Sequence, residues 1–133
     1  MTRPISTYLN AILPPILWAG IIFLFSHQSI LPGFSLSVLD FLFKKSAHVF
    51  VFGVLYLLIW RAGFLIKFNA KKLDSSLMTS YQNWWLPLAI VIIYAVSDEL
   101  HQSLVSGRSA SLRDVGFDTL GASLMMLKIY HYI

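Results

Sequence analysis

The stretch "SAHVFVFGVLYLLIWRAGFLI", Ser46–Ile66, decides the fold class of this chain, and Arg61 is the only residue in it with a formal charge at neutral pH. A helix needs about 20 mostly apolar residues to cross the hydrocarbon core of a bilayer. The whole chain has the same character, because 57% of its 133 residues are hydrophobic and 12% are charged, against roughly 25% charged residues in soluble domains. The sequence therefore predicts an all-α, polytopic membrane protein.

Three further segments have the length and apolarity of membrane-spanning helices. They are Tyr8–Phe25, Trp84–Val105 and Leu112–Tyr132. No small-x-small cleavage pattern follows the first segment, so we expect it to be retained rather than removed as a signal peptide. The four spans predict a single domain over residues 1–133, folded as a four-transmembrane-helix bundle.

The connecting segments indicate where the helices begin and end. Leu31–Ser37 contains Pro and Gly and predicts a loop, followed by a short interfacial helix over Val38–Phe43. Lys67–Asn83 is polar, and Ser106–Ala110 predicts a tight turn. Ser111–Asp114 resembles a capping box, in which the fourth side chain accepts from the backbone N–H of the first residue. We therefore expect the last helix to begin at about Ser111.

Lysine and arginine near the span ends predict the orientation, because cytoplasmic loops carry an excess of both. Four spans place the two termini on one side, which collects Arg3, Arg61, Lys67, Lys71, Lys72 and Lys128, against Lys44, Lys45, Arg108 and Arg113 on the other. We expect both termini in the cytoplasm. The basic residues are scattered between apolar blocks, which favours anionic lipids over nucleic acid as partners. The absence of cysteine excludes disulfides and cysteine-ligated metals, and no pattern indicates an oligomeric state.

Antiparallel packing brings the ends of the first and third spans beside the starts of the second and fourth. A charged side chain at the centre of a spanning helix costs about 2.5–3.5 kcal/mol, so such residues face inward, pair or bind a ligand. The polar residues at these four ends are Ser26, His27, Gln28, Lys45, His48, Asp98, Glu99, His101, Gln102, Arg108, Asp114 and Asp118. The sequence thus predicts one polar pocket at the extracytoplasmic membrane face.

Helical spacing assigns these residues to faces, since positions three and four apart lie on one side of a helix. Asp98, His101 and Gln102 share a stripe, and Glu99 is turned by about 100° from Asp98. On the last span, Asp114 and Asp118 share a face with the glycine at position 121, which would allow a neighbouring helix to approach closely.

The residue types in this pocket are compatible with both chemistry and packing. Asp98, Glu99, His48 and His101 could act as a catalytic acid and base, or hold a divalent metal. No cofactor is predicted, because the chain has no H-E-x-x-H or comparable ligand pattern. Lys45 and Arg108 could hold a phosphate or carboxylate. The substrate-binding set would be completed by Gln102, Asp114, Asp118, Gln28 and Ser26. The alternative is a salt-bridge network that only fixes helix packing.

The chain resembles the VanZ-like family of small bacterial membrane proteins in these same residues. The matching pieces are Ser26-x-Gln28, Lys45-x-x-His48, Asp98-Glu99-x-His101-Gln102, Gly107-Arg108, Asp114 and Gly121. They run in order from about residue 10 to 125. The family usually has Asn where this chain has Asp118. Its founding member is linked to low-level teicoplanin resistance, so the resemblance implies a role near the cell envelope, in the bacterial cytoplasmic membrane, and supplies no reaction.

Three functions remain open at this point. The preferred hypothesis is that the pocket binds, and in the enzyme version processes, an anionic envelope amphiphile such as a polyprenyl phosphate or a glycopeptide-related lipid. The alternative is a scaffold or binding protein whose polar network is structural. A small ion transporter is disfavoured, because the polar groups gather near one face and form no continuous pathway.

Overall fold

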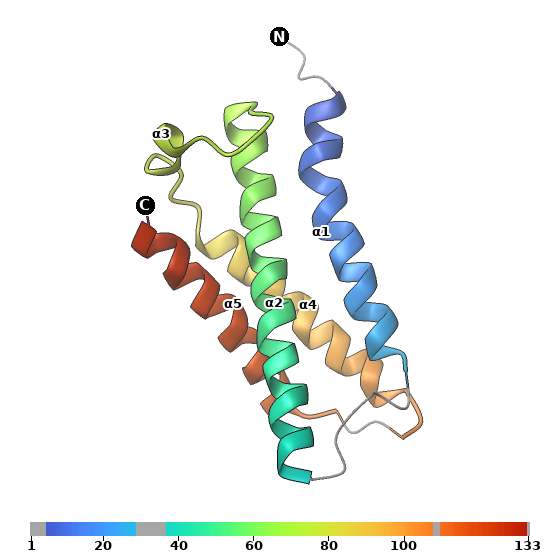
Figure 1. Cartoon of the computed structure of the whole chain (residues 1–133). Coiled ribbons are helices and arrows are strands. Elements are labelled where there is room, and N and C mark those ends of the chain that lie inside the picture. Colours follow the sequence, from blue (N-terminus) through green and yellow to red (C-terminus); the bar gives the residue numbers. More distant parts are fainter. Residues whose placement is uncertain (1–4, 29–36, 108–109, 133) are drawn as a thin grey trace.

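The computed structural model describes residues 5–28, 37–107 and 110–132, and these residues form an all-helical structure (Figure 1). The four long helices are α1 (Ile5–Ser26), α2 (Ser37–Phe68), α4 (Trp85–Ser103) and α5 (Leu112–Tyr132), with the single-turn helix α3 (Ser75–Met78) between α2 and α4. The all-α prediction is confirmed.

The helix α2 lies at the centre and packs against α1, α4 and α5. The C-terminal ends of α1 and α4 and the N-terminal ends of α2 and α5 meet at one end of the molecule, which is the lower end in Figure 1. The opposite end carries the start of α1, the end of α5 and the connection that contains α3. This is the antiparallel arrangement on which the predicted meeting of polar residues depends.

The helix α2 begins earlier than the sequence pattern predicted, at Ser37 instead of Ser46. The predicted separate interfacial helix is therefore wrong, because its residues form the first turns of α2. No proline or glycine interrupts the chain between Ser37 and Gly53, and Lys44 Nζ lies 2.8 Å from Asp40 Oδ2 one turn before it. Such an i,i+4 pair supports helix continuation.

The backbones of α2 and α5 come into direct contact at Gly121. A Cβ atom at this position would lie 2.9 Å from Val49 Cα and would also overlap the Val49 carbonyl group. On α2, a Cβ at Gly53 would lie 3.1 Å from the carbonyl oxygen of Gly121. The close approach expected at Gly121 is confirmed, and it brings the acidic face of α5 against α2.

The polar connection between α2 and α4 is anchored to the core by one aromatic side chain. Tyr81 is buried, and its ring centroid lies 5.4 Å from that of Trp60 and 5.7 Å from that of Phe64. Asp74 caps α3 by accepting a 2.9 Å hydrogen bond from the backbone N–H of Ser76. Sequence periodicity missed this anchor, because a single tyrosine in a polar segment has no pattern.

Two helices among the described residues are long and apolar enough to cross a membrane, namely Ile5–Ser26 and Val38–Phe68. The helices α4 and α5 are also long but do not combine the same apolarity with so few charges. Asp98 and Glu99 lie in α4, and Arg113, Asp114, Asp118 and Lys128 lie in α5. The prediction of four spans is therefore supported directly for α1 and α2 only.

Candidate polar binding site

The C-terminal half of α4 presents a polar stripe to α1. Asp98 Oδ2 accepts hydrogen bonds from the Ser26 hydroxyl and from Gln102 Nε2, each 2.8 Å long. Gln102 Nε2 also lies 3.2 Å from Ser26 Oγ. All three side chains are buried. Asp98 and Gln102 lie together because they are four residues apart on α4. Their contact with α1 depends on how the two helices pack, which the spacing does not give.

The same stripe places His101 against α1. His101 Nε2 lies 3.2 Å from His27 Nδ1, and the two rings are stacked with centroids 5.4 Å apart. The ring of Phe23 covers His101 at 4.6 Å. His101 was predicted to work beside the acids as a proton carrier. Its described hydrogen bond instead goes to a second histidine on the outer side of the bundle.

Two ion pairs join α2 to α5. Lys45 Nζ pairs with Asp114 Oδ1, and His48 Nδ1 lies 2.8 Å from Asp118 Oδ1. The basic residues are three apart on α2 and the acids four apart on α5, so both pairs form between matching helix faces. The Asp118 side chain is completely buried, which makes a hydrogen-bonding partner necessary for its charge.

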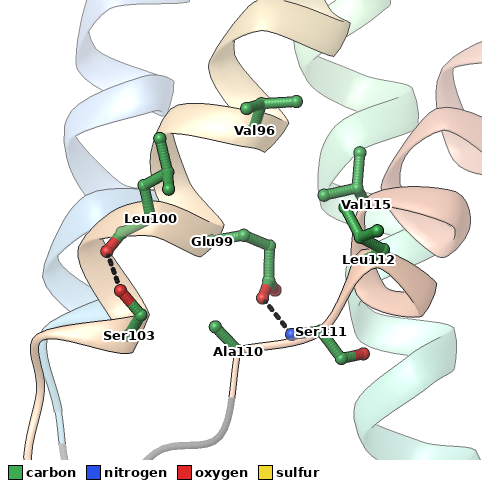
Figure 2. A pocket seen from close by; sticks show the side chains of 8 residues that line it. All are labelled: Val96, Glu99, Leu100, Ser103, Ala110, Ser111, Leu112 and Val115. Atoms are coloured by element: carbon green, nitrogen blue, oxygen red, sulfur yellow. Dashed lines mark hydrogen bonds between the residues drawn. The ribbon is translucent and has the colours of Figure 1, made fainter.

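Glu99 points away from α1 and toward the start of α5. Its Oε2 accepts a 2.9 Å hydrogen bond from the backbone N–H of Ser111 (Figure 2). The predicted capping box named the wrong acceptor for the Ser111 N–H. The acceptor is Glu99 of α4, and the expected acceptor, Asp114, pairs with Lys45 instead. A carboxylate at a helix N-terminus also interacts favourably with the helix dipole.

These groups form one electrostatic cluster. Glu99 interacts electrostatically with Asp114, Asp118 and His48, and Asp118 interacts with Asp98. We call the eight residues together the polar cluster: Ser26, Lys45, His48, Asp98, Glu99, Gln102, Asp114 and Asp118. The predicted meeting of four remote segments is thus present in the structure.

Among the described residues, the polar cluster contains more acidic than basic side chains. Its carboxyl groups belong to Asp98, Glu99, Asp114 and Asp118, and its cationic groups to Lys45 and His48. One oxygen on each of Asp98, Glu99 and Asp118 is buried and has no hydrogen-bond partner in the described part of the chain. Because a buried unpaired acceptor costs about 1–3 kcal/mol, these oxygens favour a proton, a cation or a donor group from a ligand.

Comparison with known protein families agrees with this arrangement. The sequence model of the VanZ/LLP1 family matches residues 11–132, which includes every residue of the polar cluster. The chain belongs to the VanZ/LLP1 family. No curated protein and no solved structure matches it.

Among the described residues of the predicted site in this VanZ/LLP1 chain, Gln28 and His101 are not part of the polar cluster. Gln28 is exposed just after α1, where its backbone N–H donates to Phe25 O at 3.2 Å. Arg108 lies outside the described residues. Sequence reasoning did not identify Glu99 as the acceptor for the Ser111 backbone N–H. It also did not pair His27 with His101. The histidine was visible beside Ser26, but only the packing of α1 on α4 identifies its partner.

A divalent metal was an alternative in the sequence pattern. Within residues 5–28, 37–107 and 110–132, no three His, Asp or Glu side chains are arranged so that they could hold a metal ion. The carboxylates of the polar cluster in this VanZ/LLP1 chain instead have separate partners. Asp98 accepts from Ser26 and Gln102, and Glu99 accepts from the start of α5. Asp114 pairs with Lys45, and Asp118 pairs with His48.

Proposed function

We propose that this VanZ/LLP1 chain is a four-helix protein of the bacterial cytoplasmic membrane that binds the head group of an anionic envelope amphiphile at the polar cluster. The observation that carries the proposal is that four remote elements bring polar side chains together at one end of the bundle, and three of these elements supply ionisable groups. Among the described residues, some of the carboxylate oxygens have no hydrogen-bond partner. Both termini would lie in the cytoplasm, so the polar cluster would face the envelope side.

The distribution of apolar residues supports a membrane setting for all four long helices. The most apolar parts of α1 and α2 are only 17% and 39% buried within the molecule, unlike the core helix of a soluble protein. Large apolar side chains are also exposed on α4 and α5, as at Ile93 and Leu124, while Asp98 and Asp118 are buried. Apolar residues outside and acids inside are the pattern expected where lipid is the solvent.

The basic residues of the site support the choice of an anionic head group. Lys45 can hold a phosphate as it now holds Asp114, with which a ligand would compete. Arg108 would be the second cation, since it follows α4 by a few residues. Hydroxyl groups on the head would donate to the oxygens of Asp98 and Asp118 that have no hydrogen-bond partner among the described residues. Such amphiphiles include polyprenyl phosphates and glycopeptide-related lipids, a class consistent with a role in teicoplanin resistance.

In the enzymatic form of this proposal, Asp98, Glu99, His48 and His101 supply the acid and base. The geometry favours His48 over His101 for this role, because His48 contacts a carboxylate whereas His101 contacts His27. Binding is the part of the proposal that the geometry supports best.

The test measures binding of a polyprenyl phosphate to the purified protein in nanodiscs, with the uncharged polyprenol as the comparison ligand. The phosphate should bind more tightly, and Lys45→Ala should weaken it about tenfold to a hundredfold, as expected for a charge-assisted hydrogen bond. Lys44→Ala is the matched control, since Lys44 is the adjacent residue and pairs with Asp40. Equal affinity for the two ligands would contradict the proposal.

A second candidate function is a non-catalytic scaffold whose polar network is structural. It is favoured by the closed pairs Lys45–Asp114 and His48–Asp118. Glu99→Gln and His101→Ala separate the candidates. A binding or catalytic site loses ligand affinity or turnover while thermal unfolding stays close to that of the wild type. A structural network shows a lowered unfolding temperature in both variants.

A further inference from the structure

A small cavity opens between the last turns of α4 and the first turn of α5 (Figure 2). Its volume is about 210 Å³. The residues around it are Val96, Glu99, Leu100, Ser103, Ala110, Ser111, Leu112 and Val115. We call this cavity the α4–α5 groove.

Glu99 forms the polar wall of the α4–α5 groove. Its side chain is 5% exposed, and Oε2 is occupied by the backbone N–H of Ser111. The other oxygen, Oε1, is buried and has no hydrogen-bond partner among the described residues. The Ser111 hydroxyl is likewise unpaired. Both side chains belong to the lining shown in Figure 2, so a donor placed in the groove lies beside the Glu99 carboxylate.

Apolar side chains continue from the groove along the outer surface of α4. Ile93, Val96, Leu100 and Leu104 follow one another at intervals of three or four residues, and all four are exposed. Residues at this spacing share one helix face. On the opposite wall Leu112 is 90% exposed. An acyl chain can therefore lie along α4 while its head group sits beside Glu99.

The charge around the groove selects the kind of head group. The polar cluster has four carboxyl groups against Lys45 and His48 among the described residues, and the cation of Lys45 is already paired with Asp114. A cationic donor in this groove is therefore attracted to Glu99. A primary ammonium is favoured over a trimethylated one, because only the primary ammonium has N–H donors for a carboxylate oxygen.

We propose that the α4–α5 groove binds the primary ammonium group of a membrane aminolipid, with Glu99 Oε1 as the acceptor and the acyl chain along the outer face of α4. This goes beyond the proposed function, because it assigns a second binding position, open to the lipid side, that uses neither Lys45 nor Arg108. The Ser111 hydroxyl would accept a second N–H from the same ammonium group.

The test titrates dodecylammonium and dodecyltrimethylammonium into the purified protein in nanodiscs of phosphatidylcholine, with an environment-sensitive fluorophore attached to Ser103→Cys as the readout. Cysteine is absent from the natural chain, so the label has one site. The primary ammonium should bind at least about tenfold more tightly, because only it has N–H donors for a charged hydrogen bond. Phosphatidylethanolamine added to the nanodisc should compete with it.

Two variants separate groove binding from general partitioning into the membrane. Glu99→Gln keeps an oxygen for the Ser111 N–H but removes the charge, so it should abolish the preference for the primary ammonium while the protein remains folded. Leu100→Trp should fill the groove and weaken binding, and Leu17→Trp is its control, since the two leucines are 64% and 58% exposed. Equal binding of both amphiphiles, or a preference that survives Glu99→Gln, overturns the proposal.

The polyprenyl phosphate experiment has an independent outcome. Ammonium selectivity without phosphate binding would sink the proposed function and leave the groove assignment standing. Phosphate binding without ammonium selectivity would overturn the groove assignment and leave the proposed function standing.

Discussion

Asp118 shows at the scale of one residue what a buried charge requires. Its carboxylate is completely buried, one oxygen meets His48 Nδ1 at 2.8 Å, and the other oxygen has no described partner. Removing one partner of a buried ion pair is usually more damaging than replacing both, because the remaining charge stays desolvated. Removing His48 should therefore destabilise the protein more than removing the charge of Asp118.

His48→Ala should lower the free energy of unfolding by about 3–5 kcal/mol, because it leaves the charge of Asp118 buried without compensation. Asp118→Asn keeps an oxygen that can accept from His48 and removes the charge, so its cost should be much smaller. In the double variant, Asp118→Asn should restore part of the loss caused by His48→Ala. Chemical unfolding in detergent micelles measures all three. Additive losses would show that the two side chains do not interact energetically.

Asp74 gives a prediction outside the membrane-spanning segments. The Ser76 hydroxyl and then the Ser76 backbone N–H hydrogen-bond its carboxylate and lower the pKa of Asp74. A lowered pKa in the folded state means that the α3 cap is fully present above the ordinary Asp pKa of about 3.9. The cap is lost as the pH falls through the lower folded pKa.

An NMR titration of the Asp74 carboxyl carbon should thus give a midpoint below the ordinary value for aspartate. Ser76→Ala should move the midpoint of Asp74 upward, because it removes the hydroxyl donor. The matched control is Ser75→Ala, since the neighbouring hydroxyl has no described bond to Asp74. A wild-type midpoint at or above the ordinary value would refute the effect of the cap on the pKa.

At the scale of helices, Gly121 sets the distance between α2 and α5. The space for a side chain at this position is filled by the backbone of Val49, including its carbonyl oxygen. Backbone atoms cannot move aside as a flexible side chain can, so a methyl group there must separate the two helices. The ion pairs Lys45–Asp114 and His48–Asp118 lie on the same interface and depend on that distance.

Gly121→Ala should therefore destabilise the bundle by about 1–3 kcal/mol, the usual cost of overpacking, and weaken both ion pairs. Gly116→Ala is the matched control on the same helix, because a Cβ there meets nothing within 4 Å. Alanine is a better helix former than glycine by roughly 0.5–1 kcal/mol, so the control should be neutral or stabilising. Thermal unfolding of the two variants side by side gives the measurement. An unfolding temperature for Gly121→Ala equal to that of its control would contradict the close approach.

The helices themselves were largely predictable from the sequence, because long apolar runs have few alternatives to a helix. Their ends were less predictable. The helix α2 begins at Ser37, whereas the apolar run begins at Ser46. An apolar run marks the part of a helix that fits in lipid, and the helix itself can extend beyond that run. The cap of α5 was assigned to Asp114, the nearest acid in sequence, while Glu99 from α4 binds the N–H of Ser111.

At the scale of the whole molecule, the meeting of four remote segments was predictable from topology alone. Antiparallel helices with short connections leave little freedom in which ends come together. The partners within the polar cluster were not predictable, because helical spacing gives the face of each residue and not the helix that this face meets. Asp98 and His101 lie on one stripe, for example, yet they contact Ser26 and His27 separately.

The proposed topology can be tested with single cysteines, since the natural chain contains none. Ser106→Cys lies at the end that carries the polar cluster, and Ser80→Cys lies in the α2–α4 connection at the other end; both positions are exposed. In intact spheroplasts, a membrane-impermeant maleimide should label Ser106→Cys only. Ser80→Cys should react after permeabilisation. Labelling of both positions before permeabilisation would contradict four spans with cytoplasmic termini.

The length of α2 has a consequence for how the protein responds to bilayer thickness. Its 32 residues extend about 48 Å at 1.5 Å per residue, whereas the hydrocarbon layer is about 30 Å deep. In the proposed topology Lys67 lies at the cytoplasmic boundary, so Lys45 and His48 would come to the opposite boundary and the preceding turns would project into the head-group layer. A thicker bilayer draws these side chains into hydrocarbon or makes α2 stand more upright. Lipid chain length should thus change the exposure of the polar cluster to water.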